Sequence, residues 1–353
     1  YYYHRPLRRT LVLYIAIQHI FVAIGPQKYR NRRHCPKWMK SDNFIQNRIH
    51  SMIKIPPYLK KGDTIGIVCP SGYMTLEKVE TSIKTLKDWG FIVKLANTVG
   101  GNSKTYFSGT DAERLLDLQM MMDDDDVKAV LCGRGGYGMG RIIDKIDFKK
   151  FRKHPKWIIG YSDITVLHSH LFSNYYISSL HAPMSGAFND GGYKNEFVLS
   201  LKSALVGKKI KYACAAHEFN KKGEAIGELV GGNLALLAHL VGTESDLKTK
   251  GKILFIEDVG EQKYNVDRMM HQLKRSGKLS KLAGLIIGGF TDTQDTERPF
   301  GQDVYEIIRD IISEYDYPVC FDFPVSHSNR NYALKVGVGY KLKVGKSKVI
   351  LEE

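Results

Sequence analysis

Short runs of apolar, often β-branched residues alternate with amphipathic stretches through residues 64–181. Such runs suit strands buried on both faces, whereas apolar residues at helical spacing predict helices. The runs predict strands at residues 64–69, 91–96, 127–132, 156–161 and 177–181, with helices at 76–89, 111–122 and 163–175 between them. A glycine-rich turn that opens a further helix follows the third strand. This alternation predicts an open parallel sheet of about five strands covered by helices.

The periodic pattern is lost between residues 186 and 223, where glycine, asparagine and lysine are frequent, and this stretch predicts a linker. A second α/β unit is expected after it, with helices at 233–241, 266–279 and 303–315, strands at 252–258, 284–290 and 319–323, and a closing pair around 336–344 and 348–351. The expected fold class is α/β. An open parallel-sheet domain at 52–185, of the flavodoxin or glutamine-amidotransferase type, precedes a smaller mixed α/β domain at 224–353.

The formal charge of +15 at pH 7 suggests nucleic-acid binding until its distribution is considered. Residues 1–51 carry ten Lys and Arg against a single acid, so this segment holds most of the basic excess. The remaining basic residues lie in clusters such as 149–153, which are typical of a solvated surface. Neither nucleic acid nor a membrane is therefore expected as a partner.

Residues 1–51 have a pattern of their own. Arg8 and Arg9 precede an apolar stretch at residues 11–24, as in a signal peptide, but no small-residue cleavage site follows. The stretch is also too short for a membrane span. We favour an upstream reading-frame extension with the natural start at Met52, and an export signal is the alternative. On either interpretation the segment is expected to lie outside the folded core.

The five cysteines are isolated from one another, without the C-x-x-C pair or the Cys/His spacing of a zinc site. Several stand inside apolar runs, where a free cysteine behaves as a small apolar residue. This usage fits a reducing compartment, so a cytoplasmic location is expected. The cysteines are Cys35, Cys69, Cys132, Cys214 and Cys320.

The glycine-rich segment at residues 133–138 matches the pattern G-x-G-x-x-G after a strand. Such a turn can hold a dinucleotide phosphate at a helix N-terminus. It follows about the third predicted strand rather than the first, and the acid expected at a strand end about 20 residues further on is missing. Its N–H groups are equally suited to an anion or an oxyanion, and a simple tight turn is the structural alternative.

Three residue types that acyl transfer needs each follow a predicted strand. Ser162 stands at a strand–helix junction, where a hydroxyl can be exposed above the sheet edge, although a helix N-cap explains it as well. The second glycine of G-x-S-x-G is replaced by Ile164. Glu257 ends an apolar strand and His327 follows another; alone, each is as readily structural or solvated. Together the serine, acid and histidine form the set of an acyl-transfer enzyme.

Several ordered motifs extend this set across residues 56–351. They include Gly109-Thr110-Asp111, Arg134-Gly135-Gly136-Tyr137-Gly138, Gly160-Tyr161-Ser162-Asp163, His181-Ala182-Pro183-Met184, Gly231-Gly232-Asn233, Glu257-Asp258 and Pro324-x-x-His327-x-x-x-Asn331. In this order they resemble the LD-carboxypeptidase family, the murein tetrapeptide carboxypeptidases. The resemblance implies that Ser162 is the nucleophile, His327 the general base and Glu257 the carboxylate that orients the imidazole.

The resemblance also implies how the rest of the site is built. The N–H of Asp163 and one from the turn at Gly135 and Gly136 would form an oxyanion hole, and Asn233 is expected to bind substrate. Family members are metal-independent, need no cofactor, are usually homodimers and place the site between two domains. Their typical substrate is a recycled muropeptide, cut between diaminopimelate or lysine and a terminal D-alanine.

Three positions depart from the family pattern: Ser326 and Ala182 replace common glycines, and Lys335 replaces a common proline. These departures remove no catalytic group, but they leave the exact peptide substrate open. A related branch that hydrolyses peptidyl-nucleotide antibiotics is one alternative function. A nucleotide-binding protein that uses the glycine-rich turn, and a catalytically inactive sensor of peptidoglycan fragments, are alternatives from other classes.

Overall fold

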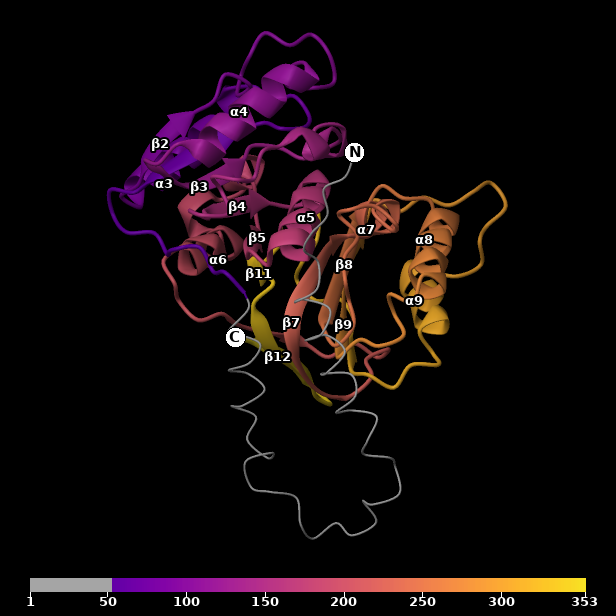
Figure 1. Ribbon diagram of the computed structural model, residues 1–353. Coiled ribbons are helices and arrows are strands. Elements are labelled where there is room, and N and C mark those ends of the chain that lie inside the picture. The colour runs from indigo at the N-terminus through magenta and orange to yellow at the C-terminus, as the bar shows by residue number, and fades with distance from the viewer. Residues whose placement is uncertain (1–52) are drawn as a thin grey trace, which may run out of the picture. The chain divides into compact units, whose positions relative to one another are not determined.

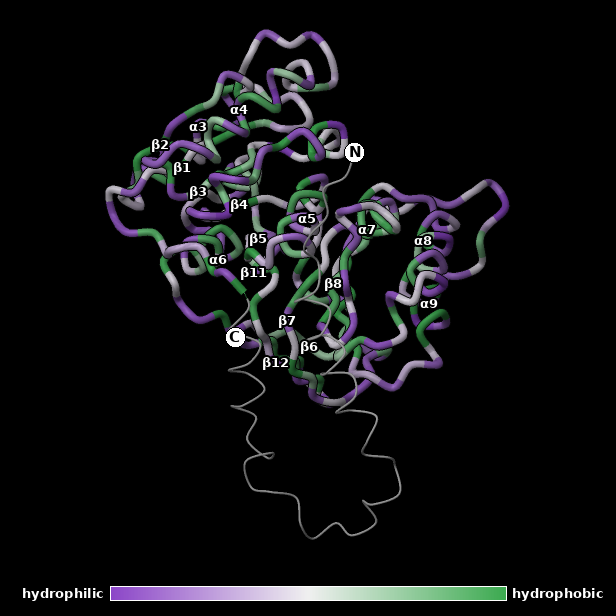
Figure 2. The backbone as a smooth tube through the Cα atoms, in the orientation of Figure 1, coloured by the Kyte–Doolittle hydropathy of each residue, from purple (hydrophilic) through white to green (hydrophobic). Residues whose placement is uncertain are grey.

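The computed structural model describes residues 53–353, which contain two β-sheets with helices packed on them (Figure 1). Hydrophobic residues follow the strands, and hydrophilic residues dominate the connecting loops (Figure 2). The predictions made for residues 1–51, Cys35 included, lie outside the described residues. No helix within 53–353 has both the length and the apolar character that crossing a bilayer requires.

The first sheet has six strands in the order β11-β5-β4-β3-β1-β2. Five of them are parallel, as the sequence predicts: β1 (Thr64–Val68), β2 (Ile92–Leu95), β3 (Val127–Cys132), β4 (Trp157–Gly160) and β5 (Ser179–His181). The helices that connect them include α3 (Glu77–Asp88), α4 (Asp111–Asp123) and α5 (Thr165–Tyr175). Helix α4 begins at Asp111 because Thr110 and Glu113 form a reciprocal capping box that satisfies its first N–H groups.

The second sheet has seven strands in the order β10-β9-β8-β7-β12-β13-β6. The parallel half consists of β7 (Gly223–Asn233), β8 (Ile253–Val259), β9 (Gly284–Thr291) and β10 (Val319–Cys320). The antiparallel half consists of β12 (Gly339–Val344), β13 (Lys348–Glu352) and β6 (Lys211–Ala215). The main helices of this part are α7 (Leu234–His239), α8 (Lys263–Arg275) and α9 (Val304–Ile311), with α8 and α9 side by side (Figure 1).

The predicted linker at 186–223 is wrong. It contains helix α6 (Glu196–Leu205), which begins at the N-cap Asn195, and the edge strand β6. Helix α6 buries apolar residues such as Leu201 in a hydrophobic core to which strands of both sheets contribute. The segment is therefore part of the fold.

Besides β6, two further strands of the described chain were missed by the pattern of apolar residues. Strand β7 is rich in glycine, which lowers strand propensity. Strand β11 (Leu334–Val336) pairs antiparallel with β5, so the C-terminal part of the chain supplies a sixth strand to the first sheet. The glycine-rich turn also opens no α-helix; it leads into short 3-10 turns at Met139–Arg141 and Ile143–Lys145.

The two sheets meet where β7 ends beside the start of α5. A side chain at Gly232 would lie 2.4 Å from the hydroxyl oxygen of Thr165, so only glycine allows this approach. The N–H of Asn233 donates to the same oxygen at 3.1 Å. These contacts bring the C-terminal ends of β7 and β8 next to the turn that carries Ser162.

Lys335, one of the departures from the family pattern, has a structural role. Its ammonium group is fully buried and lies 2.8 Å from the carboxylate of Glu353, with the hydroxyl of Tyr58 at 3.3 Å. A buried charge that loses its partner is strongly destabilising. We expect Glu353→Gln to lower the free energy of unfolding by about 3 kcal/mol, measured by urea denaturation.

The neighbouring glutamate provides the control for that measurement. Glu352 pairs with Lys211 at 3.0 Å, but both side chains are solvent-exposed. Exposed pairs contribute less than about 1 kcal/mol, so Glu352→Gln should have little effect. Equal effects of the two substitutions would show that the buried pair has no special role.

Candidate active site

Ser162 lies in the tight turn between β4 and α5 and has a strained backbone. Its φ is +62°, in the left-handed region that residues other than glycine seldom occupy. Such a conformation costs on the order of 1–3 kcal/mol and persists where the surroundings enforce it, commonly at functional sites. Gly160 makes the turn possible, because a Cβ there would lie 2.9 Å from Ile164. The half-buried Ser162 thus resembles the exposed nucleophile of a strand–turn–helix elbow.

The glycine-rich turn after β3 packs directly against Ser162. A Cβ on Gly135 would lie 2.8 Å from Cβ and 3.0 Å from Oγ of Ser162. Gly136 adopts a φ of +99°, which also favours glycine. The N–H groups of Gly135 and Gly136 donate to no acceptor within residues 53–353. They are therefore free to bind an oxygen atom that approaches Ser162.

The side chain of Asp163 ties this turn to the serine turn. Its buried carboxylate accepts hydrogen bonds from the Ser71 hydroxyl at 2.5 Å and from the Met139 N–H at 2.7 Å. Burial raises the pKa of Asp163, although both hydrogen bonds oppose the increase. The side chain thus has a structural part, while its main-chain N–H remains the predicted oxyanion donor.

Glu257 and His327 form a buried pair. The Nδ1 atom of His327 lies 2.6 Å from Oε2 of Glu257, which is fully buried in the C-terminal half of β8. The other ring nitrogen of His327, Nε2, is buried and has no hydrogen-bond partner among the described residues. A carboxylate on Nδ1 keeps the proton there and leaves Nε2 as the acceptor. This is the arrangement that a general base requires.

His327 and Tyr161 line one cavity of about 420 Å³, and Ser162 itself follows Tyr161 in the chain and is not among the lining residues. The ring of His327 packs edge-to-face on Tyr161, the residue before Ser162, with 4.9 Å between ring centres. No hydrogen bond joins Ser162 to His327 in the part of the chain described. Catalytic hydrogen bonds are often long until substrate binds. The structure thus brings Glu257 to His327, and His327 to the neighbour of Ser162.

Two glycines that the sequence patterns did not single out lie against the segment just before His327. A Cβ on Gly288 would lie 2.2 Å from the carbonyl oxygen of Val325 and 3.2 Å from Cβ of Glu257. A Cβ on Gly289 would lie 2.7 Å from Cβ of Ser326. A glycine pair inside an apolar strand marks a place where another backbone comes close, and this signal was available in the sequence.

Asn233 uses its side chain within the protein. Its Oδ1 accepts from the N–H of Leu236 and caps α7, and its Nδ2 donates to Asp258 at 2.7 Å. Burial and the charge of Glu257 raise the pKa of Asp258 to about 7, against the effect of three N–H donors. Asn233 therefore holds the acid next to Glu257, and its predicted part in substrate binding stays a prediction.

Both halves of the chain match known protein-family domains. The profile of the LD-carboxypeptidase N-terminal domain matches residues 65–182, and that of the C-terminal domain matches residues 226–342. The chain belongs to the LD-carboxypeptidase family. It is accordingly a serine-type peptidase, and the two-part α/β fold predicted from the sequence is confirmed.

Individual relatives agree with this assignment. A protein of Bacillus subtilis (strain 168) called probable murein peptide carboxypeptidase is 36% identical over 302 residues, which cover 84% of this chain and 94% of that protein. The crystal structure of muramoyltetrapeptide carboxypeptidase from Oxalobacter formigenes superimposes with a TM-score of 0.75 at 29% identity, covering 82% and 98% of the two chains. The microcin C7 self-immunity protein MccF with adenosine monophosphate gives 0.76 at 21% identity, covering 85% and 98%. This last likeness shows the fold alone.

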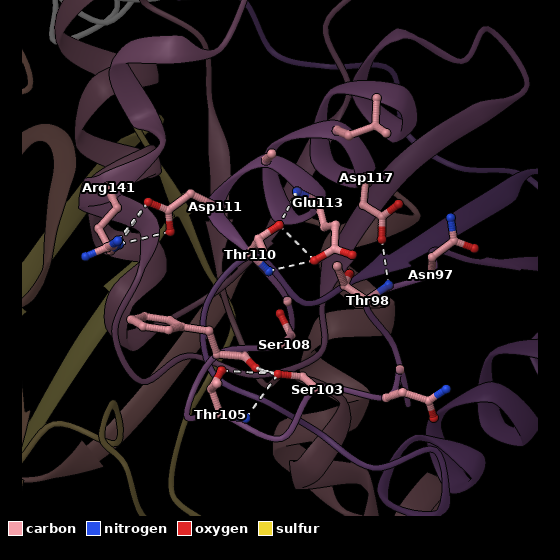
Figure 3. A pocket seen from close by; sticks show the side chains of 16 residues that line it. Asn97, Thr98, Ser103, Thr105, Ser108, Thr110, Asp111, Glu113, Asp117 and Arg141 are labelled. Carbon is pink, nitrogen blue, oxygen red and sulfur yellow. Dashed lines mark hydrogen bonds and ion pairs between the residues drawn. The ribbon is translucent and has the colours of Figure 1, made fainter.

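A larger cavity of about 840 Å³ lies elsewhere in this LD-carboxypeptidase, between the loop after β2 and the start of α4 (Figure 3). Its charged side chains are engaged with one another or with the main chain. Arg141 pairs with Asp111, Glu113 caps α4, and Asp117 accepts from the N–H of Thr98 (Figure 3). Within residues 53–353 no three His, Cys, Asp or Glu side chains are grouped as metal ligands. The smaller cavity, in contrast, is lined by His327, whose Nε2 has no partner among the described residues.

The environment of His327 predicts the pH dependence of this peptidase. Burial lowers the pKa of His327, but the charge and hydrogen bond of Glu257, with a smaller effect of Asp258, outweigh burial and raise it above the ordinary value of 6.5. A general base must be neutral, so activity is lost as pH falls through this raised pKa. We expect the acid limb of a kcat/KM profile to lie above 6.5; a limb at lower pH would contradict the assignment.

The close packing of Gly135 on Ser162 gives a second prediction. In Gly135→Ala the new methyl group must displace Ser162 or the turn, and misplacing a reacting group by about 1 Å can cost about 100-fold in rate. We expect kcat/KM for peptide hydrolysis to fall by roughly that factor. Gly140→Ala is the control, because a Cβ there meets nothing within 4 Å. Equal activity of the two variants would contradict the packing argument.

Proposed function

We propose that this chain is a metal-independent carboxypeptidase that removes the terminal D-alanine from murein tetrapeptides, cutting the bond after L-diaminopimelate or L-lysine. The observation that carries the proposal is the Glu257–His327 pair: the carboxylate holds Nδ1, Nε2 is buried without a partner among the described residues, and the ring packs on Tyr161, the residue before Ser162. The murein peptide carboxypeptidases among its relatives support the class of substrate.

In the first half of the proposed reaction, Oγ of Ser162 attacks the carbonyl carbon of the scissile bond while Nε2 of His327 takes the hydroxyl proton. The oxyanion that forms accepts hydrogen bonds from the N–H of Asp163 and from the turn at Gly135. The imidazolium is stabilised by the carboxylate of Glu257. When the C–N bond breaks, His327 returns the proton to the amine of the departing D-alanine.

The second half removes the acyl group from Ser162. A water molecule takes the place of D-alanine and gives a proton to Nε2 of His327 as it attacks the ester carbonyl. The tripeptide acid leaves, and the proton returns to Oγ of Ser162. Each step uses only side chains and N–H groups that line the site, so the proposal includes insensitivity to metal chelators.

Cytoplasmic location, homodimerisation and a role in peptidoglycan recycling belong to the same proposal. The four cysteines of the described residues, Cys69, Cys132, Cys214 and Cys320, are all free thiols, as a reducing compartment would favour. An exported enzyme with the same active site would act on intact cell wall instead. Fractionation of the producing cells separates these two possibilities.

The substrate class is tested by offering the purified protein two kinds of compound. One is the tetrapeptide L-Ala-D-Glu-diaminopimelate-D-Ala, together with its isomer that ends in L-alanine. The other is aspartyl sulfamoyl adenosine, which occurs bound to the related fold of MccF. Release of D-alanine only from the first peptide supports the proposal. Hydrolysis of the sulfamoyl adenosine alone would assign the antibiotic-hydrolysing function instead.

A further inference from the structure

The cavity beside His327 carries a local excess of positive charge. Its lining includes two cationic side chains, Arg134 and Lys78, and one carboxylate, Asp190. The rings of Tyr161 and His327, which pack on each other, also line this cavity. A peptide that enters this cavity therefore meets cations close to the reacting groups. Anionic groups of the peptide are the chemistry that these cations would recognise.

Of the two cations that line the cavity, Arg134 belongs to the turn that packs on Ser162. It directly precedes Gly135, whose Cα packs against Ser162. Its Nη1 donates to the carbonyl oxygen of Tyr73 at 2.7 Å, and its side chain lies along Gly72, where a Cβ would be 3.5 Å from Nε. The N–H of Gly72 in turn donates to the carbonyl oxygen of Gly135 at 3.0 Å. The guanidinium group is thus anchored to the turn that packs on Ser162.

Most of the hydrogen-bonding capacity of this guanidinium group remains unused. Arg134 makes no ion pair with a carboxylate among residues 53–353, and of its five N–H groups only Nη1 has a protein acceptor there. A planar guanidinium matches a carboxylate in bidentate geometry. In a carboxypeptidase the α-carboxylate of the last residue lies one residue from the scissile carbonyl. Arg134 lines the same cavity as His327, so a carboxylate of a peptide bound there can meet its free N–H groups.

We propose that Arg134 binds the terminal α-carboxylate of the peptide and thereby restricts cleavage to free C-termini. This inference rests on the proposed carboxypeptidase function and assigns its specificity to one side chain. The carboxylate held by Arg134 orients the last residue so that its amide nitrogen faces Nε2 of His327. Arg134 would then select exopeptidase over endopeptidase cleavage.

Lys78 is the competing cation. Both cations are exposed, but Lys78, on α3, makes no side-chain hydrogen bond or ion pair in the part of the chain described, whereas Arg134 donates to Tyr73. A flexible, strongly hydrated ammonium group holds a carboxylate with less directional precision than an anchored guanidinium group. The geometry therefore favours Arg134, and Lys78→Gln becomes a comparison within the experiment.

The experiment compares two peptides that differ only at the C-terminus: the tetrapeptide with a free D-Ala carboxylate and the same tetrapeptide as the D-Ala amide. The wild-type full chain should cleave the acid with the higher kcat/KM. In Arg134→Gln we expect kcat/KM for the acid to fall roughly 10- to 100-fold, the range of a hydrogen bond to a charged group, and that for the amide to change less than about threefold. Preference for the free carboxylate would then be largely lost.

Arg134→Lys and Arg275→Gln provide the controls. Arg134→Lys keeps the charge without the bidentate geometry and should recover part of the preference. Arg275, exposed at the end of α8, lines no part of the cavity, so Arg275→Gln should preserve the preference fully. An equal loss on both peptides in Arg134→Gln, or loss of preference in Lys78→Gln instead, would overturn the assignment.

A binding measurement separates failure of this inference from failure of the proposed function. Ser162→Ala, with and without Arg134→Gln, is titrated calorimetrically with the acid and the amide peptides. The inference predicts that only the acid peptide loses affinity, by roughly 10- to 100-fold, when Arg134 is replaced. Absence of turnover in the wild type together with this binding pattern would contradict the proposed reaction but keep the carboxylate site. Equal affinities of both peptides for both proteins would exclude the carboxylate site.

Discussion

Replacement of Ser162 by alanine is expected to lower kcat for D-alanine release by about 10⁴-fold or more, because no other group at this position can form the acyl-enzyme. The substitution removes one oxygen atom from a half-buried turn, so the fold and peptide affinity should change little. Rates of D-alanine release and calorimetric titration with the tetrapeptide measure the two effects separately.

A matched serine elsewhere on the surface controls for general damage. Ser276 follows α8 and donates its hydroxyl hydrogen bond to Leu273, away from the candidate cavity. Ser276→Ala should retain wild-type kcat. If Ser162→Ala also retains more than about a tenth of the activity, a different nucleophile must be at work, since removal of a true serine nucleophile leaves far less.

Glu257→Gln is expected to have the second-largest effect, lowering kcat/KM by about 10³- to 10⁴-fold. The amide can present an N–H to Nδ1 of His327 and so stabilise the tautomer whose Nε2 carries the proton. The substitution also removes the negative charge that raises the pKa of His327 against the lowering effect of burial. The pKa of His327 should therefore fall, and the acid limb of the pH profile should move to lower pH.

Glu244→Gln is the control for this substitution, because Glu244 is exposed in the turn after α7. It should leave both the rate and the pH profile unchanged. A Glu257→Gln variant with reduced rate but an unshifted acid limb would mean that another group, not His327, titrates in that limb.

The five parallel strands of the first sheet and the helices between them could be predicted from the sequence because each has a clear local signal. Strand β3 is apolar at nearly every position, and α4 begins after a Thr110/Glu113 capping pair, so their predicted bounds match the structure within one residue. In contrast, β7 gains its stability from pairing with β8 and β12 rather than from its own glycine-rich sequence. Such tertiary stabilisation has no local signal.

Long-range pairing explains the other failures. Leu334–Val336 forms a strand in the first sheet only because β5 offers an open edge there. Likewise β6 lies at an edge of the second sheet by pairing with β13. A pattern read along the chain assigns such segments to a linker or to the nearest unit, because their partners lie more than a hundred residues away.

The residues of the candidate site also differ in whether the sequence alone could identify them. Ser162, Glu257 and His327 could be proposed because resemblance to the LD-carboxypeptidases marked them among many similar residues. Local pattern alone did not separate them from caps and solvated strand ends. The contact of Gly135 with Ser162 and the anchoring of Arg134 depend on the packing of separate turns, so they required the structure.

The most direct test of the proposed function is release of D-alanine from L-Ala-D-Glu-diaminopimelate-D-Ala by the purified full chain and its Ser162→Ala variant, side by side and with excess EDTA. The proposed function predicts release by the wild type at a rate that EDTA does not change, and none above background by the variant. Release by both proteins, loss of release in EDTA, or no release by well-folded wild type would contradict it.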